Sequence, residues 1–312
     1  MTPPDTAYDT NIQKIRERFS SISIRKAAII TFFAMLPFGL ILFITASALD
    51  IKGLRMELIL SKTPYLVTLG LIFYAFRIKK LSLIPILKDN GKYRGEILLV
   101  LPLIVFSITV VWIAILFLNL ASSSVAQSYL DYMNSIEFLV TSEDTPLIDY
   151  LFIFIAIAIL PPLLEEIVFR GAMIERLGRK YSYKTALIIS SVLFGVMHID
   201  IVGALTFGVI LSLIYLKTGS LFIPILIHVI NNGLVVIFMF MDDQFLQIDP
   251  WLTIEPYIEY SWIAILLFIL SSGWLIKYIK NNWHFVHDKE PVRGVVEAKP
   301  DKNQDNKFSP VP

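Results

Sequence analysis

The sequence predicts an all-α, polytopic membrane protein with about eight transmembrane helices, on three observations. Of its 312 residues, 56% are hydrophobic and only 17% are charged, whereas soluble domains are about 25% charged. Long apolar runs recur along the chain, separated by polar segments. The charges of those polar segments alternate between basic and acidic, as the loops of a multi-pass membrane protein do.

The composition also narrows the classes of function. The chain has no cysteine, which excludes disulfides and thiolate chemistry, and only four histidines are available for a histidine-based site. The net charge is +1 and no basic face points to nucleic acid, so we expect no nucleic-acid partner. Residues 1–26 are polar and basic and lack the short apolar core of a signal peptide, so they are predicted to form a cytoplasmic N-terminal arm.

The apolar runs are taken as spans where they approach the roughly 20 residues that a crossing needs. The predicted spans are 27–49, 58–76, 97–121, 151–169, 221–241 and 261–276. The run 185–216 would measure roughly 48 Å as one helix, against roughly 30 Å of hydrocarbon. This run is therefore predicted to be a hairpin of two short helices, whose turn near His198 stops inside the membrane, where a protein-lined or wet cavity must satisfy its backbone.

Loop charges support the hairpin. Residues 77–96 carry six Lys or Arg and residues 170–184 carry five, whereas 122–150 and 242–260 each carry none and five acids. Basic loops favour the cytoplasmic side, and eight spans place all four segments correctly. One loop departs mildly from this rule, because residues 50–62 contain basic residues although eight spans place them outside.

A terminal reporter tests this count. Eight spans put both termini in the cytoplasm, so a reporter fused after residue 312 is expected to report the cytoplasm. A reporter on the outer side would show that the number of crossings is odd.

The organisation that follows has five parts. They are the arm 1–26, the N-terminal transmembrane helices 27–147, a segment 148–241 that carries the candidate functional residues described next, an outer loop with the last span 242–279, and a polar cytoplasmic tail 280–312 whose end is expected to be disordered.

Ionisable side chains inside spans cost about 2.5–3.5 kcal/mol each on insertion scales, so they are candidates for function. The candidates, with one polar neighbour, are Glu165, Glu166, Arg170, His198, His228 and Asn232. Glu166 and Arg170 are four residues apart and can pair on one helix face, while Glu165 is turned about 100° away. The alternative is that both glutamates simply mark a solvated helix end, and that the histidines make structural hydrogen bonds.

The predicted depths leave the convergence of these residues open. At 1.5 Å per residue from the cytoplasmic ends, the estimated depths are about 12 Å for His228, about 18 Å for Asn232, about 21 Å for His198 and about 5–8 Å for Glu165. Pro161 and Pro162 are expected to bend the fourth span and tuck Glu165 inward.

Two chemistries fit the residue types. A carboxylate and an imidazole can activate water for attack on a peptide carbonyl, with a second imidazole and an amide as oxyanion donors. Glu165, His198 and His228 could instead be ligands of a catalytic divalent metal such as zinc. The H-E-x-x-H segment of common zinc proteases is absent from the sequence.

Three motifs in order resemble one family. "EEIVFR" (165–170), "FGVMH" (194–198) and "HVINN" (228–232) resemble the motifs of the CAAX-protease and bacteriocin-processing (Abi) family of intramembrane endopeptidases, over about residues 148–240. The resemblance implies that Glu165 activates water with help from His198, and that Glu166 and Arg170 form a supporting ion pair. His228 and Asn232 would be transition-state donors, or partial metal ligands if a metal is used.

The resemblance implies a protein or peptide substrate that is membrane-associated or lipidated, and we expect a multi-pass protein of a bacterial inner membrane. Two rivals remain. A non-proteolytic immunity or scaffold protein on the same fold would tolerate conservative replacement of Glu165 and His198. A small transporter could use the same residues as a proton relay, although no inverted repeat is found in the sequence.

Overall fold

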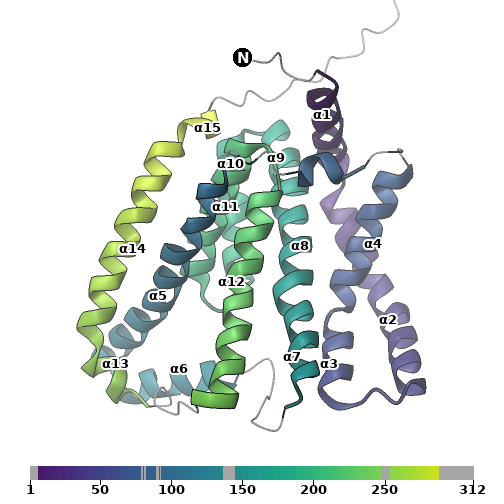
Figure 1. The fold of residues 1–312 in the computed structure, drawn as a ribbon. Coiled ribbons are helices and arrows are strands. Elements are labelled where there is room, and N and C mark those ends of the chain that lie inside the picture. Colours follow the sequence, from purple (N-terminus) through teal and green to yellow (C-terminus); the bar gives the residue numbers. More distant parts are fainter. Residues whose placement is uncertain are drawn as a thin grey trace, which may run out of the picture.

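The architecture is helical throughout the part of the chain that the computed structural model describes, which is residues 6–78, 80, 82–88, 91, 93–135, 145–246 and 253–287 (Figure 1). The predicted all-α class is therefore confirmed. In the first half the elements are α1 (Thr6–Ser21), α2 (Ile24–Ala48), α3 (Gly53–Ser61), α4 (Thr63–Ile78), η1 (Ile84–Leu87), η2 (Arg94–Leu99), α5 (Val100–Ala121) and α6 (Ser123–Ser135).

The second half begins with one continuous helix made of α7 (Leu147–Ile153), η3 (Phe154–Ile159), α8 (Leu160–Glu166), η4 (Ile167–Ile174) and α9 (Glu175–Lys180), in which η3 and η4 are π-helical. It continues with α10 (Tyr183–Val196), α11 (Ile201–Thr218), α12 (Phe222–Met241), η5 (Asp242–Leu246), α13 (Glu255–Glu259), α14 (Ser261–Asn282) and α15 (His284–His287).

Six helices in the described residues are long and apolar enough to cross a membrane, and α3 with α4 form a further candidate bent by 41°. These seven candidates correspond to seven of the eight predicted segments. The eighth corresponds to the apolar helix α10, which is shorter than a full span. Both α1 and α15 lie at one end of the bundle, whereas α6 and α13 lie at the other (Figure 1).

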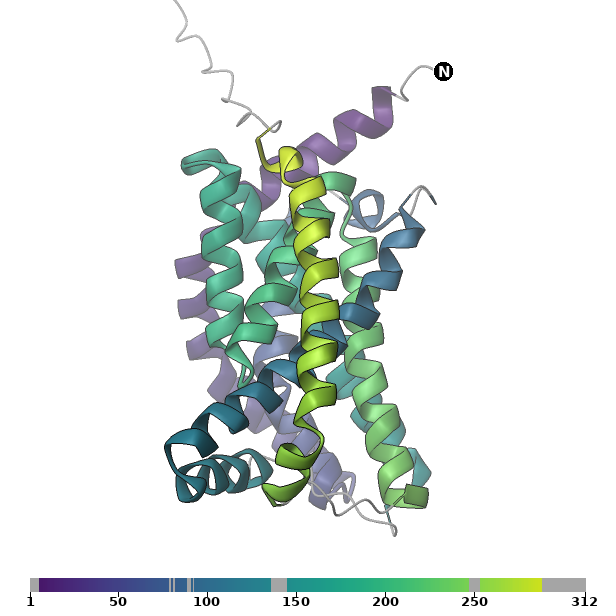
Figure 2. The same ribbon diagram turned by 90° about the vertical axis from the view of Figure 1, so that its left-hand side faces the viewer.

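The predicted short-helix hairpin is present as α10 and α11, which pack against each other. Two glycines permit their close approach: a Cβ on Gly208 would lie 3.0 Å from the Cα of Ser191, and one on Gly195 would lie 2.9 Å from the carbonyl oxygen of Ile201. Asp200 caps α11 by accepting a hydrogen bond from the backbone N–H of Gly203. The turn between the two helices stops partway across the bundle, well short of α6 (Figure 2).

The N-terminal segment, predicted to be a cytoplasmic arm, is a helix packed against the rest of the chain from residue 6 onward. Residues 6–21 form α1, whose Ile15 and Phe19 are fully buried in a hydrophobic core shared with the helices of the bundle. The Phe19 ring packs against Phe76 and lies 3.0 Å from where a Cβ on Gly171 would be. This apolar face is not evident from the sequence, because Ile15 and Phe19 are four residues apart and the residues around them are mostly polar or charged.

A buried polar cluster fixes α1 to the second half of the chain. The guanidinium of Arg16 donates to Glu175 at 2.8 Å, and Glu175 is fully buried. The hydroxyls of Tyr215 and Tyr183 donate to the same carboxylate at 2.8 and 3.2 Å. This set satisfies a carboxylate that would otherwise be costly to bury.

The helices depart from the predicted segment boundaries at four places. Residues 53–61 of the expected outer loop form α3, and residues 123–135 of the next outer segment form α6. The fourth span does not end at residue 169, because the helix continues to Lys180. The tail does not begin at residue 280, because α14 reaches Asn282 and α15 follows; residues 1–5, 136–144, 247–252 and 288–312, including the expected disordered end, lie outside the described residues.

Candidate functional site

The long helix from Leu147 to Lys180 carries both glutamates near its middle. Glu165 lies fifteen residues before the end of that helix, which places it roughly 22 Å from that end. The sequence-based depths of about 5–8 Å for Glu165 and about 12 Å for His228 left their meeting open. The structure brings the two side chains together, with His228 Nε2 on α12 3.8 Å from Glu165 Oε2.

Glu166 and Arg170 form the ion pair that their spacing allows. An Arg170 guanidinium N–H donates to Glu166 Oε1 at 2.8 Å, and both side chains have 0% exposure. The guanidinium also donates to the carbonyl oxygen of Gly208 at 3.3 Å and lies 4.7 Å from the centroid of the Phe194 ring. This pair therefore ties the glutamate helix to both helices of the α10–α11 hairpin.

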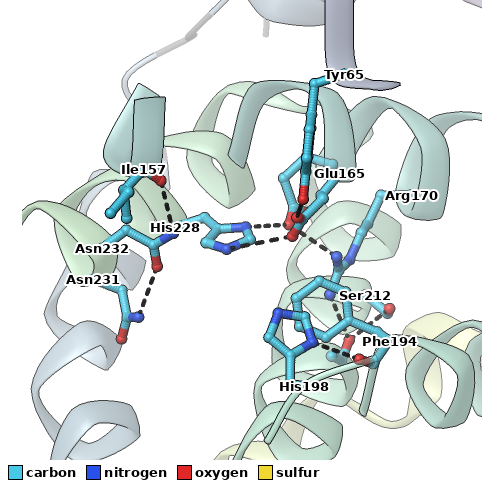
Figure 3. Close-up of polar contacts among 12 residues, drawn as sticks. Tyr65, Ile157, Glu165, Arg170, Phe194, His198, Ser212, His228, Asn231 and Asn232 are labelled. Carbon is cyan, nitrogen blue, oxygen red and sulfur yellow. Dashed lines mark hydrogen bonds and ion pairs between the residues drawn. The ribbon is translucent and has the colours of Figure 1, made fainter. Parts of the chain in front are cut away.

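His228 bridges the two glutamates (Figure 3). Its Nδ1 lies 2.9 Å from Glu166 Oε1, and its Nε2 lies 3.8 Å from Glu165 Oε2. A carboxylate only accepts hydrogen bonds, so Nδ1 carries a proton that it donates to Glu166. The 3.8 Å separation is too long for a hydrogen bond. Nε2 of His228 and Oε2 of Glu165 therefore face each other without being bonded to each other.

Glu165 is the more accessible of the two glutamates, with its side chain 16% exposed. Its Oε1 accepts a hydrogen bond of 3.2 Å from the hydroxyl of Tyr65, which stands on α4 (Figure 3). Sequence reasoning missed Tyr65, because it lies in the first half of the chain, where no motif was recognised. The only available signal was a tyrosine in an apolar run, which is too common to single out.

Asn232 satisfies a backbone carbonyl that the chain itself leaves without a partner. Its Nδ2 donates to the carbonyl oxygen of Ile157 at 3.1 Å. In an α-helix that oxygen would bond to the N–H of residue 161, and in a π-helix to that of residue 162, but Pro161 and Pro162 have none. The two prolines therefore do not break the helix, and they create an acceptor that fixes Asn232 one turn from His228.

His198 lies at the end of α10, partly exposed, and is not joined to the glutamates by any hydrogen bond or ion pair among the described residues. Its Nδ1 lies 2.7 Å from the carbonyl oxygen of Phe194, and the two rings have centroids 4.4 Å apart. A carbonyl only accepts, so Nδ1 carries the proton and Nε2 of the neutral ring is free to accept one. Phe194 also contacts the His228 ring at 5.8 Å and so separates the two histidines.

The candidate metal ligands Glu165, His198 and His228 are not assembled as a metal site. Among the described residues, no group of three or more His, Asp or Glu side chains is placed to hold a metal ion. His228 uses Nδ1 on Glu166, and His198 uses Nδ1 on its own helix, so a shared metal would need His198 to move toward the other two. The residues as placed do not fit zinc.

The fold and these contacts define a class: a polytopic helical membrane protein with a Glu–His–Arg cluster buried inside the helix bundle. Comparison with known families places the central part of the chain more narrowly. Residues 147–234 match the family model described as type II CAAX prenyl endopeptidase Rce1-like, which agrees with the resemblance of the motifs. The matched segment contains all six candidate residues and excludes Tyr65.

Two curated relatives agree with this placement. The chain is 38% identical over 106 residues to the membrane-embedded CAAX protease MroQ of Staphylococcus aureus (strain USA300), a match covering 31% of this chain and 42% of that protein. It is 32% identical over 105 residues to the putative membrane peptidase YdiL of Bacillus subtilis (strain 168), covering 33% of this chain and 38% of that protein. The matches thus cover about two fifths of the relatives' own lengths. No solved structure matches the chain significantly.

Proposed function

We propose that this chain is an intramembrane endopeptidase that hydrolyses peptide bonds of membrane-associated or lipidated protein or peptide substrates with a water activated by Glu165. The observation that carries the proposal is the different treatment of the two adjacent glutamates. Glu166 is fully buried and engaged with Arg170 and His228, whereas Glu165 is partly accessible and keeps one oxygen open. We therefore assign Glu166 a structural role and Glu165 the catalytic role.

The proposed reaction balances through Glu165. The carboxylate takes a proton from water while the water oxygen bonds to the carbonyl carbon of the peptide, and the carbonyl oxygen becomes an oxyanion. When the tetrahedral intermediate collapses, the C–N bond breaks and the leaving nitrogen receives the proton from Glu165. General acid–base catalysis of this kind contributes about 10²- to 10⁴-fold.

The remaining candidates are assigned supporting steps. The free Nε2 of His198 accepts a hydrogen bond from the attacking water, with its tautomer set by the carbonyl of Phe194. Asn232 has a second amide hydrogen beyond the one used on Ile157, and this is its donor for the oxyanion. His228 can donate from Nε2 only when its ring carries both protons, because Nδ1 is engaged with Glu166.

We further propose that both termini are cytoplasmic and that the protein resides in a bacterial plasma membrane. The two described ends of the chain, α1 and α15, lie at the same end of the bundle as α9 and the C-terminal end of α4 (Figure 1), which carry Arg77, Arg176, Arg179 and Lys180. The positive-inside rule assigns this end to the cytoplasm.

The proposal is tested with purified full-length protein. Membranes from cells that lack the chain are incubated with it in detergent, and new protein N-termini are labelled and identified. We expect specific new termini, and their formation should survive treatment with a strong divalent-metal chelator. Loss of cleavage on chelation, with recovery on adding zinc, would replace the water-activation account by a metal-dependent one; the absence of any new terminus would contradict the protease proposal.

A further inference from the structure

Among the described residues outside the Rce1-like segment, Tyr65 is the one whose side chain forms a hydrogen bond with Glu165. It lies on α4, just after the bend between α3 and α4, and α4 packs against α8, which carries Glu165. The ammonium group of Lys62, at the bend, lies 5.6 Å from the centroid of the Tyr65 ring. The Tyr65 ring therefore lies between Lys62 and the helix that carries Glu165.

The contact divides the Glu165 carboxylate into two unequal oxygens. Oε1 accepts the Tyr65 hydroxyl at 3.2 Å, while Oε2 faces His228 Nε2 at 3.8 Å (Figure 3). Within the described residues, no other hydrogen bond to the Glu165 side chain is recorded. A carboxylate held at one oxygen cannot rotate freely about its last bond, so Oε2 of Glu165 stays directed toward His228.

The other charged groups around Glu165 do not replace this restraint. On the same helix, Glu166 and Arg170 are engaged with each other, and Arg170 also binds the carbonyl of Gly208. Lys62 from the α4 side acts on Glu165 electrostatically, and a charge without a hydrogen bond fixes no orientation. His228 from α12 faces the oxygen that must remain open.

We propose that Tyr65 is a positioning residue that holds Glu165 in the orientation needed to take a proton from water, so that the catalytic site is completed by a helix outside the Rce1-like segment. This inference rests on the proposed proteolytic function. A purely structural role for Tyr65, as an interhelical contact, is the alternative. The Tyr65 ring packs against the hydrophobic core that contains Phe19 and Phe76, and this packing remains when only the hydroxyl is removed.

The test compares Tyr65→Phe with Tyr74→Phe, a matched control on the same helix whose side chain is exposed. Both variants are purified at full length, checked for thermal stability, and assayed on a peptide spanning a cleavage site found with the wild type. We expect Tyr65→Phe to lower kcat about tenfold, the range for a hydrogen bond to a charged group, with KM and stability unchanged. Tyr74→Phe should match the wild type in all three.

Two outcomes would overturn the inference: an unchanged kcat in Tyr65→Phe, or a fall that follows a loss of stability equally. Glu165→Gln is assayed beside them to keep the two proposals apart. If Glu165→Gln is inactive while Tyr65→Phe is fully active, the positioning role fails and the proteolytic function stands. If Glu165→Gln remains active, the proposed function itself fails.

Discussion

Glu165→Gln is expected to lower proteolysis by about 10²- to 10⁴-fold while leaving the protein folded, because the change removes only the group that accepts the proton. The amide is isosteric with the carboxylate and can still accept the Tyr65 hydroxyl through its oxygen, so the contact with α4 is retained. The measurement is the cleavage rate of the purified variant, with its melting temperature determined in the same detergent.

Glu57→Gln provides the matched control, because Glu57 is an exposed glutamate on α3 and touches none of the site residues. It should cleave at the wild-type rate. A Glu165→Gln protein that retains more than about a tenth of the wild-type rate would be inconsistent with general-base catalysis by this residue.

Arg170→Ala is expected to have the largest effect on stability. Glu166 and Arg170 are both fully buried, and removal of the guanidinium leaves an ionised carboxylate with His228 as its remaining partner. Breaking a buried pair in this way costs about 3–5 kcal/mol. The expected result is a low protein level in the membrane and a lower melting temperature, together with a loss of activity.

A double variant separates the charge from the packing. In Glu166→Gln with Arg170→Met, neither partner leaves an uncompensated charge, so most of the stability lost in Arg170→Ala should return. Normal protein level and full activity in Arg170→Ala alone would contradict the supporting role of this pair.

Much of the fold follows from the sequence, because the constraints that set it act locally. Apolar runs of about 20 residues and the sign of loop charge are enough to place the spans. The hairpin formed by α10 and α11 follows from length together with loop charge, since residues 185–216 are too long for one crossing and the charges of the flanking loops fit two helices. The Glu166–Arg170 pair likewise follows from helical spacing.

Other features depend on contacts that a single sequence does not encode visibly. The helix that carries the two glutamates continues to Lys180, and its Gly171 packs against Phe19 of α1. The sequence predicted only a cytoplasmic arm where α1 lies. The contact of Tyr65 with Glu165 joins residues 100 positions apart. The bond from Asn232 to Ile157 becomes intelligible only when Pro161 and Pro162 are seen within a continuous helix rather than at its break.

The most direct test of the account compares protein termini in cells that carry the wild type with those in cells carrying Glu165→Gln at matched expression. The account predicts that a specific set of membrane-protein termini is present with the wild type and absent with the variant, which would also identify the substrates. Identical termini in the two strains, with a wild-type phenotype kept by the variant, would contradict it and would favour a non-proteolytic immunity or scaffold function.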